Sequence, residues 1–190
     1  METTRIRKVL NDFFRLKRTY RSGWSFYGHD PGETVAAHTF GVAILTLLVG
    51  RELQKEGVTL DLHKALVMAL IHEVGESRLG DLHLEARRFL GQETVRKAEE
   101  AAVQEVFGDD ETLVNLWREF EAGETIEAQL VRALDKLELL FEAAERAKSP
   151  KQRIQTIFQT PSNRPFFETF TLVQDLYRSL KKEMEASTDE

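Results

Sequence analysis

Polar side chains able to bind a metal ion stand at the end of the most apolar segment of the chain. Seven apolar residues, 65–71, run directly into His72 and Glu73, and Glu76 and Asp81 follow. An uninterrupted apolar run of helical length is typical of a buried helix. Burying a histidine and three carboxylates is costly unless they are paired, so the segment predicts a divalent cation as their partner.

Two more residues of ligand type lie in apolar segments elsewhere. His38 falls in the first turns of a predicted apolar helix, and Asp135 lies among leucines in the stretch LVRALDKLELL. Two imidazoles and two carboxylates suit Mn, Fe, Co, Ni or Zn, with water in the remaining coordination positions. Adjacent residues of a helix point about 100° apart, so His72 and Glu73 share an ion only if other helices supply the remaining ligands.

The composition excludes several alternatives. The 190 residues include no cysteine, which removes disulfides, thiolate nucleophiles and thiolate metal sites. The formal net charge of -6 argues against a general nucleic-acid-binding protein, but not against one small phosphate-bearing ligand. The N-terminus lacks the apolar core of a signal peptide, and no apolar stretch reaches about 18 residues, so we expect a cytoplasmic protein without a spanning helix.

Helical periodicity dominates the chain, and no strand pattern is present. We expect an all-α, single-domain protein over residues 1–190, with a metal-site core at about 30–147 and C-terminal helices at 150–187. Asp30, Pro31 and Glu33 predict the start of a central helix. The expected helices are 4–16, 34–56, one from 59 or 61 that carries His72, 84–90, 93–107, one around 113–120, 125–147, one from Ser149-Pro150 and one after Pro165, with 17–28 as a loop or short turns.

Four stretches together resemble the HD-domain metal-dependent phosphohydrolase superfamily, and in particular its 5′-deoxynucleotidases. They are LKRTYRSGW at 16–24, ETVAAH at 33–38, IHEVGESRLGD at 71–81 and ALDKLE at 133–138. That family's pattern is a His, a His-Asp pair and a distant Asp. The chain departs from the pattern at one position, where Glu73 stands in place of the Asp. Glu73 keeps a carboxylate, but its side chain is longer than that of Asp. The substitution leaves open an altered metal preference or a weakened metal site.

The resemblance implies a role for each matching residue. Glu76 orients or deprotonates the attacking water, Asp81 lies near the substrate sugar, and Trp24 lines the nucleotide pocket. The implied metal ligands are His38, His72, Glu73 and Asp135. The candidates for phosphate contact are Lys17, Arg18 and Arg21.

Structural alternatives exist for each of these residues. His38 and Trp24 are also the kinds of residue found in a core, and Asp135 has Arg132 as an ion-pair partner within reach along its helix. Glu76 and Asp81 suit a solvated face or a turn at a helix end equally well, and the basic run suits a solvated surface.

The expected function is that of an enzyme. Some dinuclear members of the family that the chain resembles use extra histidines between the His-Asp pair and the last Asp. Only His83 lies in that interval here, so the resemblance implies one divalent ion (Mn, Co, Fe, Ni, Mg or Zn). The resemblance implies removal of the 5′-phosphate from (deoxy)ribonucleoside 5′-monophosphates, giving nucleoside and phosphate, and a homodimer. The departure at Glu73 keeps open a degenerate module that binds a nucleotide or a partner without turnover. Hydrolysis of another phosphate ester at the same site, a diester or a triphosphate, is the third alternative.

Overall fold

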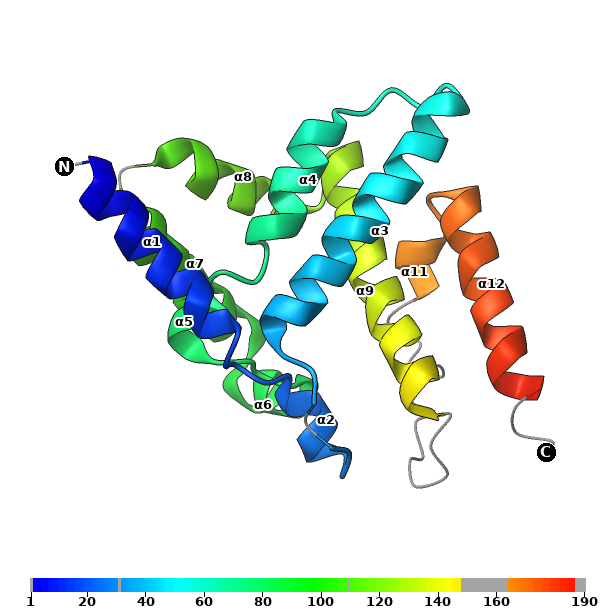
Figure 1. The fold of residues 1–190 in the computed structure, drawn as a ribbon, viewed down its shortest axis with the longest axis horizontal. Helices are drawn as coiled ribbons and strands as arrows, with labels where there is room; N and C mark the ends of the chain where they lie inside the picture. The colour runs from blue at the N-terminus through cyan, green and yellow to red at the C-terminus, as the bar shows by residue number, and fades with distance from the viewer. Residues whose placement is uncertain (1, 31, 109, 148–163, 187–190) are drawn as a thin grey trace. The chain divides into compact units, whose positions relative to one another are not determined.

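The computed structural model describes residues 2–30, 32–108, 110–147 and 164–186. The helices in that part of the chain are α1 (Glu2–Leu16), α2 (Ser22–Phe26), α3 (Val35–Lys55), α4 (Leu62–Ile71), α5 (Glu76–Leu79), α6 (Leu84–Leu90), α7 (Gln92–Phe107), α8 (Glu111–Ala122), α9 (Ile126–Ala147), α11 (Arg164–Phe167) and α12 (Thr171–Ala186) (Figure 1). Extended pairing among the described residues is limited to a single bridge between Tyr20 and Thr34. The all-α prediction is confirmed.

Contacts divide the chain into two compact units. The first comprises Met1–Phe40 and Leu70–Glu121, and the second comprises Gly41–Ala69 and Ala122–Glu190. The division falls within α3 and within α4, so each of these helices begins in one unit and ends in the other. The expectation of a single domain over 1–190 stays a prediction.

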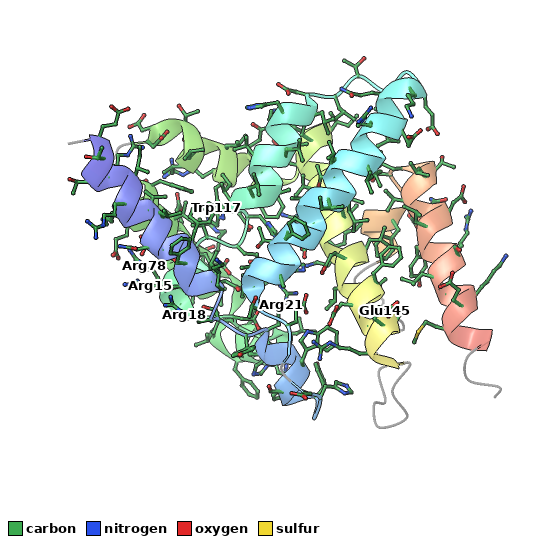
Figure 2. The ribbon with its side chains drawn as sticks, viewed as in Figure 1. Arg15, Arg18, Arg21, Arg78, Trp117 and Glu145 are labelled. Atoms are coloured by element: carbon green, nitrogen blue, oxygen red, sulfur yellow. The ribbon has the colours of Figure 1, made fainter. Side chains whose placement is uncertain are left out.

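In the first unit, one guanidinium joins three helices that pack together, α1, α5 and α7 (Figure 1). Arg78 of α5 donates to both carboxylate oxygens of Asp12 on α1, at 2.5 and 2.9 Å, and to Glu105 of α7 at 2.9 Å. Arg15, which Figure 2 labels beside Arg78, lies 3.4 Å from the same Asp12. Since Asp12 is buried, these cations compensate a carboxylate that would otherwise be costly inside the protein.

The second unit has a continuous apolar core in which α9 packs against α11 and α12 (Figure 1). Along α9, fully buried leucines recur at helical spacing, at Leu130, Leu134 and Leu137. Asp135 is also buried, but at 100° per residue it lies on a different side of α9 from these leucines. The rest of the core comes from Val49, Leu53, Leu60, Ala133, Leu140, Ala144, Phe167, Phe170, Val173 and Leu180.

The start of the central helix differs from the prediction. Helix α3 begins at Val35, and its N-cap is Thr34, whose Oγ1 accepts a hydrogen bond from the backbone N–H of Ala37 at 3.2 Å. Glu33 lies before the helix and so is not its capping-box residue; its carboxylate accepts a hydrogen bond from the indole Nε1 of Trp24 at 2.5 Å. Pro31 lies outside the described residues. The N-cap prediction for Asp30 is therefore wrong.

Other helix boundaries are partly as predicted. Helices α1, α6, α7 and α9 match the periodicity closely. The expected loop at 17–28 contains the short helix α2, α5 was not predicted, and the last expected helix is two helices, α11 and α12. The helix expected from Ser149-Pro150 lies outside the described residues.

Helix α3 is long and apolar enough, by length and composition, to cross a membrane, which corrects the expectation that no stretch qualifies. About half of its most apolar part, 44%, is buried inside the protein. Core helices of soluble proteins meet the same criterion, so α3 is weak evidence for a membrane span.

Candidate active site

Backbone hydrogen bonds next to the start of α3 hold the segment that carries Arg21. The N–H of Arg21 donates to the carbonyl of Glu33 at 3.0 Å, and the N–H of Val35 donates to the carbonyl of Thr19 at 2.8 Å. These bonds fix the segment after α1 against the entry to α3. His38, one turn into α3, is fully buried.

His72 and Glu73 lie in a turn rather than in a helix. Helix α4 ends at Ile71, and residues 72–75 form the turn that leads into α5. The carbonyl of His72 accepts a hydrogen bond from Nε1 of Trp117, a residue labelled in Figure 2, at 3.1 Å. The imidazole of His72 also packs edge-on against the ring of Phe120, with the centroids 5.4 Å apart. Helix α8 thus holds the turn and its histidine in place.

Two histidines and one carboxylate converge in the first unit. Oε1 of Glu73 lies 3.9 Å from Nε2 of His38 and 3.8 Å from Nε2 of His72. The two imidazole centroids are 5.6 Å apart. Ligand atoms about 2.0–2.2 Å from one ion are roughly 3–4 Å from each other, so these three side chains are compatible with a divalent metal ion.

Arg21 forms an ion pair with Glu73. Its Nη1 lies 3.2 Å from Oε1 of Glu73, and its side chain is only 13% exposed. A guanidinium beside this carboxylate is well placed to bind a second anion as well, because it has donors in a planar fork. Figure 2 shows Arg21 in the connection between α1 and α2, with Arg18 nearer the end of α1.

Glu76 is the first residue of α5, and it is buried near Glu73 and Arg21. Burial raises the pKa of its carboxyl well above the usual value of 4.5, and the nearby Glu73 and Asp81 raise the pKa further, while Arg21 opposes them. Its Oε2 has no hydrogen-bond partner among the described residues. A carboxyl whose pKa is raised by burial is better suited to accept and return a proton than an ordinary carboxyl.

Asp81 is fixed by the start of α2. Its Oδ2 accepts from the backbone N–H of Ser22 at 2.5 Å and from the Ser22 hydroxyl at 2.6 Å. Gly80, with φ at +73°, makes the turn out of α5 that presents Asp81 to Ser22. The sequence did not single out Ser22, although a serine directly before the Gly23 break was available as a signal.

The predicted nucleotide-pocket residue Trp24 is 2% exposed, and its Nε1 donates to Glu33. It therefore presents little surface to a ligand, and its proposed role stays a prediction. Lys17 lies over the ring of Phe14, 4.9 Å from the centroid, and Arg18 is exposed. Of the predicted phosphate contacts, the structure brings Arg21 to Glu73.

Asp135 belongs to α9 in the second unit. It is buried, and its Oδ2 accepts from Nζ of the neighbouring Lys136 at 2.7 Å. Arg132, the alternative partner, lies over the ring of Phe166, 5.5 Å from its centroid. The assignment of Asp135 as the fourth metal ligand stays a prediction.

The sequence pattern of the HD domain matches residues 13–168. The chain belongs to the HD-domain family. A 5′-deoxynucleotidase of Dictyostelium discoideum is 28% identical over 83% of this chain and 90% of that protein. A 5′-deoxynucleotidase of Saccharomyces cerevisiae is 26% identical over 72% of this chain and 64% of the yeast protein.

The chain is also similar in fold and sequence to solved structures. A conserved hypothetical protein from Pyrococcus furiosus superposes with a TM-score of 0.78 and is 30% identical, covering 93% of this chain and 98% of its own. A protein from Pyrococcus horikoshii superposes with a TM-score of 0.75 and is 31% identical, covering 91% of this chain. With the curated relatives, the family membership identifies this HD-domain protein as a hydrolase.

Proposed function

We propose that this HD-domain hydrolase removes the 5′-phosphate from nucleoside 5′-monophosphates, including the deoxy forms, and uses one divalent metal ion. The observation that carries the proposal is the convergence of His38, His72 and Glu73, with Arg21 bonded to the same Glu73. Relatives named 5′-deoxynucleotidases support the choice of substrate.

In this proposal His38, His72 and Glu73 hold the ion, and Asp135 is the fourth ligand. The Glu73 side chain supports the assignment, because its extra methylene does not keep Oε1 from lying within 4 Å of both imidazoles. When bound, the ion lowers the pKa of a water molecule and polarises a phosphoryl oxygen.

The residues of the first unit supply the remaining chemistry. Arg21 binds the phosphate and offsets its charge beside Glu73. Glu76 takes a proton from the attacking water as the water oxygen bonds to phosphorus. The bond between phosphorus and the 5′-oxygen breaks, and Glu76 returns the proton to that oxygen, which gives nucleoside and phosphate.

A non-catalytic function is the second candidate, because Glu73 replaces the Asp of the family's His-Asp pair. In that case the chain binds metal and a nucleotide without turnover. A different phosphate ester as the substrate is a third. The homodimer implied by the resemblance belongs to the same proposal, as do the cytoplasmic location and the single-domain organisation expected from the sequence.

The test is phosphate release from a panel of ribo- and deoxyribonucleoside 5′-monophosphates, after chelation and again with added Mn, Co, Mg, Ni or Zn. We expect metal-restored release from the deoxy substrates. Metal binding without release from any monophosphate would support the non-catalytic candidate. Release from a cyclic diester or a triphosphate alone would assign a different ester to the site.

A further inference from the structure

We propose that three rings of the first unit, Phe26, Tyr27 and His83, bind the base of the nucleotide by stacking. These residues are called the aromatic ledge below. The inference rests on the proposed function and adds the means by which the site prefers a nucleoside phosphate over a simple phosphate ester.

The ledge is a compact aromatic surface. The rings of Phe26 and His83 are stacked, with centroids 4.0 Å apart and planes 22° apart. Tyr27 meets Phe26 edge to face at 5.1 Å and 88°. Phe26 is 51% exposed and Tyr27 is 50% exposed. Stacked and edge-to-face rings with half of their surface exposed can take a further flat ring at little cost in rearrangement.

His83 is held in place before any ligand arrives. It is the N-cap of α6, and its Nδ1 accepts a hydrogen bond from the backbone N–H of Ala86 at 3.3 Å. This bond places the remaining proton of the neutral ring on Nε2 and fixes the plane of the ring. Phe26 stacks on a ring that is already oriented.

Asp81 connects both Phe26 and His83 to the candidate active site. Helix α2, which carries Phe26, starts at Ser22, and Ser22 donates two hydrogen bonds to Oδ2 of Asp81. His83 follows Asp81 by two residues, at most about 7 Å of extended chain. Asp81 in turn lies beside Glu76. Asp81 therefore links the ledge to Glu76, the carboxylate proposed to accept a proton from the attacking water.

Burial of Trp24 makes this ledge the aromatic surface that α2 offers to a ligand. Trp24 points into the core and bonds to Glu33, whereas Phe26 and Tyr27, two and three residues later, are exposed. Every base has a flat π-face, so stacking suits several bases and favours a nucleoside over a ligand without one.

The test is binding of 2′-deoxyadenosine, which has no phosphate and needs no metal ion, to the full chain by equilibrium dialysis. The variants are Phe26→Ala and His83→Asn; asparagine keeps an N-cap acceptor for α6 while removing the ring. The matched control is Phe89→Ala, which removes an aromatic ring of α6 that is 80% exposed. Circular dichroism of each variant checks that the helices are retained.

We expect each ledge variant to bind 2′-deoxyadenosine at least fivefold more weakly than the wild type, within the range of about 5- to 150-fold that corresponds to loss of one stacked base. The control should bind as the wild type does. In kinetics, KM for deoxyadenosine monophosphate should rise more than KM for deoxyribose 5-phosphate, which has no flat ring to stack on the ledge.

Two results overturn the ledge: nucleoside binding that is absent in the wild type, or binding equal in the wild type and both folded ledge variants. These results are distinct from failure of the proposed function. That failure is read from the wild type alone, as no phosphate release from any nucleoside monophosphate. Nucleoside binding that depends on the ledge, in a protein that releases no phosphate, would retain the ledge and reject the enzyme.

Discussion

Glu73 and His72 are neighbours in the chain, and Oε1 of Glu73 lies 3.8 Å from Nε2 of His72. Two consecutive side chains meet in this way because α4 ends at Ile71 and the chain turns through residues 72–75. The same Oε1 lies 3.9 Å from Nε2 of His38. One carboxylate oxygen is therefore placed to share an ion with two imidazoles.

The first prediction concerns this carboxylate. Glu73→Gln keeps the size of the side chain and removes its charge, so affinity for Mn²⁺ should fall by at least about tenfold, the lower end of what perturbing a metal site costs. Glu73→Asp keeps the charge on a shorter side chain and should change the order of preference among Mn, Co and Zn. Metal titration of the chelated protein measures both effects.

The control for this prediction is Glu56→Gln, which neutralises an exposed glutamate at the end of the α3 segment. It should bind metal as the wild type does. Full affinity in Glu73→Gln would remove Glu73 from the ligand set. An unchanged order of preference in Glu73→Asp would mean that the departure from the family pattern has no effect on metal choice.

The second prediction separates two arginines of the basic run. Arg21 lies 3.2 Å from Glu73 and is nearly buried, whereas Arg18 is exposed. Arg21→Met should raise KM for a nucleoside monophosphate by about tenfold or more, since charge-assisted hydrogen bonds contribute about 1.5–3 kcal/mol. Arg18→Met should change KM by less than about twofold, as expected for a solvated charge. Equal losses in the two variants would show that the phosphate site includes both residues.

The sequence was sufficient to single out His38, His72 and Glu73, whose side chains converge in the structure. His38 and His72 were noticeable because they interrupt apolar helical segments, where an imidazole needs a partner. Hydrophobic periodicity was likewise enough to place α7 and α9, since long amphipathic helices repeat their apolar face many times. These features are local, so they can be recognised without knowing the fold.

The features that the sequence did not reveal depend on contacts between distant segments. The bonds from Ser22 to Asp81 and from Trp24 to Glu33 decide which faces of α2 are buried. The sequence alone did not show that Trp24 is buried with its indole N–H bonded to Glu33. The turn after Ile71 was also unpredictable, because the apolar run gives no reason for a helix to end before His72.

The third prediction tests whether Asp135, which belongs to the second unit, is a metal ligand. Asp135→Asn keeps the shape of a buried side chain and removes its charge, so the chelated variant should keep its helical circular dichroism and bind Mn²⁺ at least about tenfold more weakly. Asp175→Asn on α12 is the matched control, because Asp175 is exposed and pairs with Arg178 on the same helix. Wild-type metal affinity in a folded Asp135→Asn protein would leave Asp135 with a structural role, paired with Lys136.

The fourth prediction is a pH dependence of stability that originates at Glu76. Burial, Glu73 and Asp81 raise the pKa of Glu76 in the folded protein above its usual value of 4.5. As pH rises from 4.5, the unfolded chain releases this proton before the folded chain does. The stability that the protonated Glu76 contributes is therefore complete below pH 4.5 and is lost as pH rises through the folded-state pKa.

Glu76→Gln cannot ionise and should not lose that contribution. In the chelated protein, the urea midpoint of Glu76→Gln minus that of the wild type should increase from pH 4.5 upward and then level off above the folded-state pKa. Glu93→Gln is a control of opposite sign, because hydrogen bonds from Arg96 and Lys97 lower the pKa of Glu93. Its midpoint relative to the wild type should fall slightly, or stay level, over the same range. A difference for Glu76→Gln that does not change with pH would mean that Glu76 has the same pKa in the folded and unfolded chains, and its assignment as the proton acceptor would lose its electrostatic basis.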